Sequence, residues 1–496
     1  MASSRKPASR TDLSDRLTDK VAQALQASAA FVVSGGAASG PAEMVVAVAL
    51  SGGRDSVALL HAAQDAVSAW SLPARVVALH VHHGLQSQAD DWDNFCAQLC
   101  AQWQLGYFVR RVSVQAGTGE GIEAAARRAR YQALGEMCRA SGAGLLLFAH
   151  HLDDQVETVL LRLFRGAGVA GMAGMPAMRR LDEDADIVLL RPWLDVPRAD
   201  IDGYCAAHDL AWIDDPSNDS TRFARNALRA QLPLLEQAFP GLRANVAQAA
   251  VHFAQAASML DDLAGAALAR LVVPARDADT LAELDLQGLR ALPASHADAV
   301  LRLWLRDLGT RAPSTARLAA MRGQLLDHGG GEPAIAHDGL VLRRFQGRVL
   351  ACRPEPETLP VPQAFSWSGE ARIVVPAWRG ELHFTRDDTF GVPEAVLRQP
   401  LRLAARHGGE RIVLRPGGPA RALKQAYQEA GVPRWRRSWL PLLWAGDVLV
   451  MAGGLGMHRR WGEAPHAPRW RVEWVQSAGG EGREQPGAGR PHHFPS

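Results

Sequence analysis

The N-terminal half of the chain alternates short apolar runs with longer segments of helical periodicity. Six apolar residues, Val45–Leu50, are rich in valine and lead into Ser-Gly-Gly, a pattern typical of a buried parallel strand that ends in a tight turn. Further apolar runs predict strands at 75–82, 106–114 and 144–148. Predicted helices alternate with the strands: one starts at 57, and two others span 89–103 and 120–140. This alternation predicts an α/β fold with a doubly wound, mostly parallel sheet.

The pattern changes in the second half. Residues 223–255 have helical spacing with interruptions near Pro233 and Pro240, and residues 264–327 repeat Ala, Leu and Arg at helical spacing. We therefore expect a small helical domain and then a mixed α/β C-terminal domain that begins with strands at 372–375 and 382–385. The predicted parts are a partly disordered leader (1–43), a catalytic domain (44–235), a helical domain (236–350), a C-terminal domain (365–476) and a disordered tail (477–496).

Composition limits the class of protein. The 496 residues are 47% hydrophobic and 21% charged, as in globular proteins of about three domains. Because no apolar run approaches the ~20 residues of a membrane span and the first residues lack a secretory signal, we expect a cytoplasmic protein without a membrane partner. The five scattered cysteines contain no Cys-x-x-Cys pair, which argues against a disulfide framework, a zinc ribbon and an iron–sulfur cluster.

The first segment that carries chemistry is Ser51–Ser56, with the sequence SGGRDS. Its glycines let backbone amides approach an anion and its serines add donors, so it predicts a phosphate-binding loop, although it lacks the lysine of a Walker A loop. Valine at Gly53 would enter the phosphate space and be disfavoured by any positive φ there. Asp55 would repel phosphate without a hard divalent cation, which implies Mg²⁺. The alternative is an ordinary strand–turn–helix without a ligand.

The second segment, His150–Thr158 (HHLDDQVET), follows the predicted strand at 144–148 and opens a helix. Asp153 or Asp154 is well placed as an ordinary helix N-cap. A cap explains only one carboxylate, whereas this turn also contains two histidines and further acidic residues, which is typical of a functional site. His151 lies three residues before Asp154, so both side chains can face one cleft.

Two further segments carry pairs of arginines at helical spacing. Arg127 and Arg130 lie three apart in a predicted helix and can hold a phosphate, although an exposed arginine face explains this spacing equally well. Arg225 and Arg229 lie one helical turn apart, after a turn-forming Asp-Pro-Ser-Asn sequence, and form a two-pronged cationic face. A helix cap followed by a surface helix is the simpler explanation of that second pattern.

The C-terminal region is locally basic although the net charge of the chain is only +2. Between 401 and 437 only Glu410 and Glu429 oppose nine basic residues, which are Arg402, Arg406, Arg411, Arg415, Arg421, Lys424, Arg434, Arg436 and Arg437. Trp435 and Trp439 lie among these arginines. The pattern predicts either a solvated basic face or a nucleic-acid-binding surface.

Together these segments resemble the tRNA(Ile)-lysidine synthetase family of PP-loop ATP pyrophosphatases. The family pairs SGGxDS with HHxDDQxET, and its two further N-terminal motifs are matched by Glu123, Arg127, Arg130, Tyr131, Asp215, Ser217, Asn218, Arg225, Asn226 and Arg229. Its last domain is matched by Arg406–Arg411, Leu423-Lys424, Glu429–Pro433, Trp435 and Pro441–Leu443. The resemblance covers roughly residues 44–475 and departs from the family pattern at Arg434, Arg436 and Trp439.

The resemblance implies ATP-dependent ligation of free L-lysine to C2 of the wobble cytidine in the CAU anticodon of an isoleucine tRNA. An adenylated cytidine would be the intermediate, AMP and pyrophosphate would be released, and the enzyme is compatible with a homodimer. The implied catalytic residues are Asp55, His151 and Asp154, with Mg²⁺ on Asp55 and Asp154. The implied ATP and pyrophosphate ligands are Ser51, Gly52, Gly53, Arg54, Asp55, Ser56 and Arg127. The implied tRNA or lysine ligands are Arg130, Glu157, Asn218, Arg225, Asn226, Arg229, Arg406, Lys424 and Arg437.

The identity of the base that deprotonates lysine stays open among Asp153, Asp154, Glu157 and His151. Two other functions also stay open. A PP-loop tRNA thiolase acting on cytidine would be expected to carry Cys-x-x-Cys pairs. A non-catalytic RNA-binding protein on a former nucleotide-binding fold would be expected to have lost Asp55, Asp154 or the loop glycines.

Overall fold

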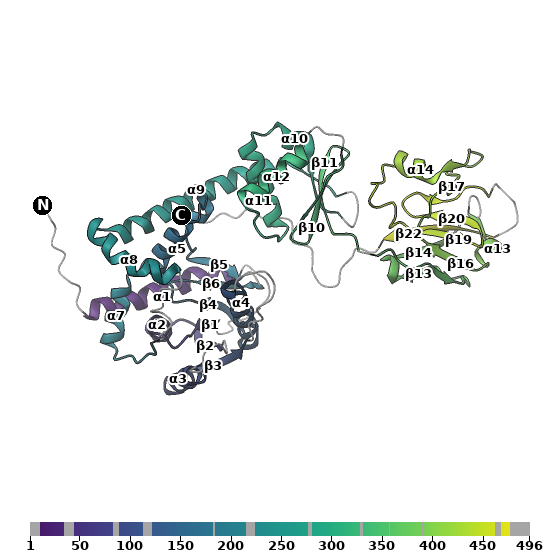
Figure 1. Ribbon diagram of the computed structural model, residues 1–496. Helices are drawn as coiled ribbons and strands as arrows, with labels where there is room; N and C mark the ends of the chain where they lie inside the picture. The colour runs from purple at the N-terminus through teal and green to yellow at the C-terminus, as the bar shows by residue number, and fades with distance from the viewer. Residues whose placement is uncertain are drawn as a thin grey trace. The chain divides into compact units, whose positions relative to one another are not determined.

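The computed structural model describes residues 10–33, 44–82, 89–112, 122–181, 184–214, 224–275, 280–327, 331–356, 358–387, 391–461 and 468–476. The chain separates into two compact units, Met1–Met259 and Leu260–Ser496, and each is described by itself. Figure 1 shows the helices and strands of both units.

The N-terminal unit contains a six-stranded sheet in the order β3-β2-β1-β4-β6-β5. Its strands are β1 (Met44–Ala49), β2 (Ala74–His82), β3 (Gly106–Arg111), β4 (Ala143–Leu147), β5 (Met178–Leu181) and β6 (Asp184–Leu190). All neighbouring strands are parallel except β5, which is antiparallel to β6. This confirms the predicted doubly wound, mostly parallel sheet. The strand order reverses direction between β1 and β4, so their carboxyl ends flank the crevice where such sheets bind ligands.

Helices cover both faces of this sheet (Figure 1). The core of one face draws on α1 (Arg10–Val33), α2 (Arg54–Ala69), α3 (Ala89–Gln102) and α7 (Arg198–Ala207), and that of the other on α4 (Ile122–Ser141). The part of the leader that the structure describes is not loose. Leu17, Val21 and Leu25 of α1 recur at a spacing of four, are fully buried, and belong to the main apolar core.

Two further helices of this unit, α5 (Leu152–Phe164) and α6 (Val169–Met172), lie between β4 and β5 in the chain. Two more, α8 (Ala224–Ala238) and α9 (Leu242–Leu271), follow α7, and α9 continues into the second unit. The predicted interruption near Pro240 is confirmed, because the chain leaves the helical conformation there and Gly241 has a φ of +84°. The predicted interruption near Pro233 is wrong, since α8 continues through that residue.

The first part of the second unit combines helices with a sheet. Its helices are α10 (Leu286–Ala291), α11 (Ala294–Asp307) and α12 (Thr315–Leu326). They pack on a five-stranded antiparallel sheet of β7 (Val272–Val273), β8 (Thr280–Asp285), β11 (Arg348–Cys352), β10 (Leu340–Phe345) and β9 (Ala334–His337). The expectation of a purely helical segment over 264–327 is therefore wrong. Leu281 and Leu284 in β8 have the three-residue spacing of a helix, which hides the strand in the sequence.

The C-terminal part contains two antiparallel sheets that share one apolar core. One sheet has β12 (Gln363–Phe365), β16 (Leu401–Ala404), β19 (Leu442–Ala445), β20 (Val448–Ala452) and β21 (Gly456–Met457). The other has β13 (Arg372–Val375), β14 (Gly380–Arg386), β22 (Arg469–Gln476) and β15 (Val392–Pro393). Smaller elements are η2 (Pro376–Trp378), α13 (Glu394–Leu397), β17 (Arg411–Ile412), β18 (Arg421–Ala422) and α14 (Leu423–Glu429). In the described part of the chain, no helix has both the length and the apolarity that crossing a membrane requires.

Candidate active site

The turn between β1 and α2 is held in one shape by its own side chains. Ser56 Oγ donates to the carbonyl of Gly53 at 2.8 Å and accepts from the amide of Ser51 at 3.1 Å. Gly52 has a φ of +83°, and a Cβ there would lie 3.2 Å from Cys96 Sγ. Gly53 has an ordinary φ of −76°, so the expectation that positive φ opposes substitution at Gly53 is wrong. Gly52 is the position at which the backbone requires glycine.

A second set of contacts fastens this turn to the chain after α7. The amide of Ile213 donates to the carbonyl of Gly52 at 2.9 Å. The Arg54 guanidinium lies 4.9 Å from the centroid of Trp212 and forms an ion pair with Asp202. The Arg54 side chain, which the sequence assigns to ATP, is therefore committed to protein partners. Its backbone amide, in the first turn of α2, and its buried Nε, which has no hydrogen-bond partner among the described residues, are left for a phosphate.

The three predicted catalytic residues come together at the carboxyl ends of β1 and β4. Asp55 lies in the first turn of α2, while His151 is the N-cap of α5 and Asp154 lies in its first turn. His151 Nε2 is 3.6 Å from Asp55 Oδ2 and 3.5 Å from Asp154 Oδ2. The His151 amide donates to Asp154 Oδ2 at 3.2 Å. The N-cap is therefore His151, and the simpler expectation of Asp153 or Asp154 at that position is wrong.

The charges of this cluster stabilise one another. Burial lowers the pKa of His151, but the nearby carboxylates of Asp55 and Asp154 outweigh it, so the pKa lies above its usual value. Burial in turn raises the pKa of Asp55, and the interaction with His151 brings it below the usual value. The two carboxylates therefore raise the proton affinity of His151.

The same residues offer the oxygen ligands that Mg²⁺ prefers. Asp55 Oδ1 is buried and has no hydrogen-bond partner among the described residues. A buried oxygen without a partner costs free energy unless a ligand satisfies it. Because Asp55 and Asp154 flank one imidazole beside the phosphate loop, their carboxylates fit a hard divalent cation.

Glu157 connects this cluster to α8. Its side chain is fully buried, and its two oxygens accept from Arg225 Nε and Arg229 Nε, each at 2.6 Å. Arg225 Nη2 also donates to Asp154 Oδ1 at 3.2 Å. The two arginines lie on one face of α8, as predicted, and that face is turned toward carboxylates. Charge-assisted hydrogen bonds to two guanidiniums satisfy the buried Glu157.

Arginines and aromatic rings gather at the end of β4. The rings of Tyr131, Phe148 and His150 stack in series, with centroids 5.7 Å and 5.4 Å apart. The Arg127 guanidinium lies 4.9 Å from the Tyr131 centroid, and that of Arg130 lies 5.6 Å from the Phe148 centroid. Cation–π attraction therefore orients the two arginines that the sequence assigns to phosphate.

His150 is a neutral member of this stack. Arg191 Nε donates to its Nδ1 at 3.2 Å, so the remaining ring proton lies on Nε2. Burial, with the nearby charges of Arg191 and Arg130, lowers the pKa of His150 to about 2. His150 therefore offers an N–H donor across the physiological pH range.

The sequence analysis did not identify Arg179 or Arg191 as part of the site. Arg179 lies on β5 with its guanidinium 5.4 Å from the Tyr131 centroid, and Arg191 directly follows β6. Both strands were missing from the prediction. The apolar run Ile187–Leu190 followed by Arg-Pro is the available signal, because it has the same strand-end pattern as the predicted motifs.

Other predicted residues lie elsewhere. Asn226 belongs to α8, and Asn218 lies outside the described residues, as do Asp215 and Ser217. The second unit carries Arg406, Lys424 and Arg437. Lys424 is exposed, whereas Arg437 donates to the carbonyl of Val432 at 2.9 Å and so stabilises its own turn.

The cysteines do not supply an alternative chemistry. All five are buried. Burial raises the pKa of Cys96 to about 12 and that of Cys100 to about 11, so neither provides a thiolate near neutral pH. This argues against the thiolase alternative.

A phosphate loop at the point where the strand order reverses, with paired carboxylates beside it, defines a PP-loop ATP-binding enzyme. Residues 18–235 match the model of the PP-loop domain. Residues 284–350 match the TilS substrate binding domain, and residues 401–474 match the TilS substrate C-terminal domain. The chain belongs to the tRNA(Ile)-lysidine synthase family and is a ligase.

Relatives cover nearly the whole chain. The tRNA(Ile)-lysidine synthase of Ralstonia nicotianae is 49% identical over 475 residues, which is 94% of this chain and 99% of that protein. The enzyme of the same name from Burkholderia pseudomallei is 40% identical and covers 88% of this chain and 94% of its own length. Among solved structures, the U34-tRNA thiolase NcsA from Methanococcus maripaludis is 14% identical, with a TM-score of 0.39 over 49% of this chain and 78% of that one. That likeness is too low to carry an argument.

Proposed function

We propose that this chain ligates free L-lysine to C2 of the wobble cytidine in the CAU anticodon of an isoleucine tRNA and converts ATP to AMP and pyrophosphate. The names of its relatives and the TilS domains support this substrate. The observation that carries the proposal is the convergence of Asp55, His151 and Asp154 beside the phosphate loop. An intact cluster of this kind argues against a non-catalytic RNA-binding protein.

In the proposed first half-reaction, the cytidine O2 attacks the α-phosphate of ATP and pyrophosphate leaves, which gives an adenylated cytidine. Such a transfer needs positioning and charge neutralisation more than a protein nucleophile. The N-terminus of α2, which includes the amide of Arg54, would receive the pyrophosphate. A Mg²⁺ ion on Asp55 and Asp154 would neutralise its charge.

In the proposed second half-reaction, the ε-amine of lysine attacks C2 and AMP leaves. This amine has a solution pKa near ~10.4 and must lose a proton first. Asp153 lies 2.8 Å from the Arg243 guanidinium, and both oxygens of Glu157 already accept from arginines. Asp154 also accepts from Arg225, so His151 is the proton acceptor that we favour.

The stack of Tyr131, Phe148 and His150 suits a base from a single-stranded anticodon loop. Proteins bind such bases by stacking and by hydrogen bonds to their edges, and they hold the backbone with cations. Arg127 and Arg130 are the cations that we assign to phosphates, and the basic region at 401–437 to the rest of the tRNA. The proposal includes a cytoplasmic location, which cell fractionation can check, and a homodimer, which light scattering can check.

Labelled lysine tests the proposal directly. A transcript of the isoleucine tRNA with the CAU anticodon should incorporate lysine only with ATP, and a transcript with uridine at the wobble position should not. Without lysine, ATP labelled at the α-phosphate should transfer its label to the tRNA. Failure to incorporate lysine would refute the ligase assignment, and absence of α-label would refute the adenylated intermediate.

A further inference from the structure

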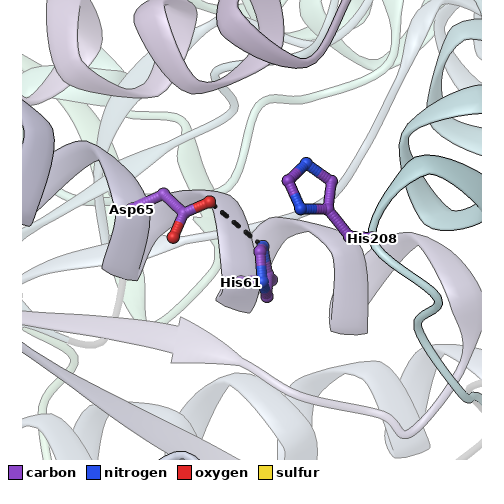
Figure 2. Close-up of side chains that lie close together, drawn as sticks. All are labelled: His61, Asp65 and His208. Atoms are coloured by element: carbon purple, nitrogen blue, oxygen red, sulfur yellow. Dashed lines mark ion pairs between the residues drawn. The ribbon is translucent and has the colours of Figure 1, made fainter. Parts of the chain in front are cut away.

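A second polar cluster lies on α2, beyond the phosphate loop. His61 and Asp65 are four residues apart on α2, and His208 follows the end of α7. Figure 2 shows the first two on one helix with the His208 ring facing them. His61 Nδ1 lies 3.3 Å from Asp65 Oδ2, and the two imidazole centroids are 4.6 Å apart. One ligating atom from each of the three residues lies within 4.8 Å of the other two.

The donor set is that of a borderline-soft metal ion. Two imidazole nitrogens and one carboxylate oxygen are typical ligands of Zn²⁺, whereas Mg²⁺ prefers oxygen alone. Tetrahedral ligands with bonds of ~2 Å lie roughly 3.3 Å apart, so the ligating atoms, which lie within 4.8 Å of one another, need to approach by up to about 1.5 Å. Among the residues that the structure describes, no other group of three or more His, Cys, Asp or Glu side chains has this spacing.

The surroundings orient the imidazoles. His208 Nε2 lies 2.5 Å from Ser14 Oγ, which leaves Nδ1 for a ligand. Metal-bound histidines usually make such a hydrogen bond through the second nitrogen. The Tyr204 hydroxyl lies 2.9 Å from His61 Nδ1 and 3.4 Å from Asp65 Oδ2, so a third oxygen borders the same space. The Asp65 side chain is 42% exposed, which leaves a route for an ion from solvent.

The cluster is separate from the candidate active site. His61 lies six residues after Asp55 on the same helix, which corresponds to about 9 Å along the axis. The cluster and its hydrogen-bond partners involve three helices, since His61 and Asp65 lie on α2, Ser14 on α1 and Tyr204 on α7. Those helices pack against α2.

We propose that His61, Asp65 and His208 bind a divalent transition metal ion, with Zn²⁺ as the preferred ion and water at the fourth position. The ion clamps α7 onto α2, while Ser14 of α1 supports His208 from behind. The role is structural, because α7 also carries the Asp202 that holds Arg54 at the phosphate loop. The basal ligase reaction does not use these three side chains.

Titration of the full-length, chelator-treated protein tests the site. Calorimetry with Zn²⁺ under excess Mg²⁺ should show one equivalent that is lost in His208→Ala and in Asp65→Asn, with affinity reduced more than about 100-fold. The matched control is His296→Ala, which removes an exposed histidine on α11 and should keep that equivalent. The melting temperature of the wild type should rise with Zn²⁺ and that of the two site variants should not.

Co²⁺ gives an independent readout. Bound at this site, it should show the intense visible absorption of a tetrahedral ion, and the nearly isosteric Asp65→Asn should abolish it while circular dichroism stays unchanged. Equal Zn²⁺ stoichiometry and affinity in His208→Ala, Asp65→Asn and the wild type would overturn the proposal. Absence of any Zn²⁺ binding by the wild type would overturn it as well.

Discussion

Gly52 is required by the backbone conformation, whereas at Gly53 we propose that the space needed by a phosphate excludes a side chain. Gly52→Ala forces an L-residue to φ +83°, with a Cβ 3.2 Å from Cys96 Sγ, and should destabilise the protein by about 1–2 kcal/mol. Gly53→Ala keeps an ordinary φ, and its Cβ would make ordinary contacts with Ser51 Oγ at 3.4 Å and the Ile213 carbonyl oxygen at 4.0 Å. It should leave the melting temperature unchanged and weaken ATP binding. Calorimetry with ATP and thermal unfolding separate the two effects, and an equal loss of stability in both variants would contradict this distinction.

His150 and His151 should contribute to stability with opposite pH dependence. The pKa of His150 falls from 6.5 to about 2 on folding, so below pH 6.5 the unfolded chain binds a proton that the folded chain does not. Its contribution is lost as pH falls, by about 1.4 kcal/mol per pH unit at most. The pKa of His151 is raised, so its contribution is present below pH 6.5 and is lost as pH rises through the folded value.

Thermal unfolding between pH 5 and pH 9 checks this pair. His150→Gln should flatten the decline of the melting temperature on the acid side, and His151→Gln should flatten the decline on the alkaline side. The same pH profile for both variants would show that the charges around the two rings do not act as the geometry indicates.

Asp55 should be required for chemistry and not for folding. Asp55→Asn keeps the size of the side chain but removes a charge at a buried oxygen that has no hydrogen-bond partner in the described part of the chain. Pyrophosphate release should fall by orders of magnitude, and added Mg²⁺ should no longer protect the protein from thermal unfolding. Asp91→Asn, at an exposed position on α3, is the matched control. Near-normal pyrophosphate release by Asp55→Asn would refute the proposed metal ligand.

At the scale of elements, Glu157 links α5 to α8 through its hydrogen bonds with Arg225 and Arg229. Glu157→Gln leaves two guanidiniums facing a neutral amide, but both arginines are more than a third exposed, so solvent screens part of the loss. We expect a destabilisation of about 1–3 kcal/mol. Hydrogen exchange should accelerate in α8 and remain unchanged in α4. Unchanged exchange in α8 would mean that apolar packing alone holds the helix.

The elements differ in how far the sequence predicts them. Strands β1, β2 and β4 are visible as valine- and leucine-rich runs because they are buried on both faces. The catalytic motifs could be placed for the same reason, since they directly follow β1 and β4. β6 continues the sheet beyond β4, and missing it also hid Arg191. Pairing between distant segments, such as β8 with β11, leaves no local signal, so the sequence pattern predicts a helix where β8 is a strand.

The side-chain contacts within the site could also not be predicted from the sequence. The motifs indicated that Asp55, His151 and Asp154 would share a cleft, because parallel strands place their carboxyl ends on one edge. They did not indicate that Arg54 pairs with Asp202, since that contact depends on how α7 packs against α2. Side-chain partners are set by tertiary packing, whereas the position of a strand end follows from local pattern.

At the scale of the whole molecule, tRNA binding should depend on exposed basic side chains of the second unit. Arg437 stabilises its own turn, so its reversal would confuse folding with binding. Arg415, Lys424 and Arg434 are exposed. Reversing these three to glutamate should weaken tRNA binding and reduce the dependence of log affinity on log salt concentration by about one unit per lost phosphate contact.

ATP affinity should hardly change in this variant, because Ser51–Ser56 belongs to the other unit. Reversal of Asp447, an exposed acidic residue of the second unit, to lysine is the matched control and should not weaken tRNA binding. Filter binding over a range of salt concentrations gives both the affinity and the slope. If the triple reversal left both unchanged, the tRNA would have to be held by the catalytic unit alone, and Arg127, Arg130 and the arginines of α8 would be the next residues to reverse.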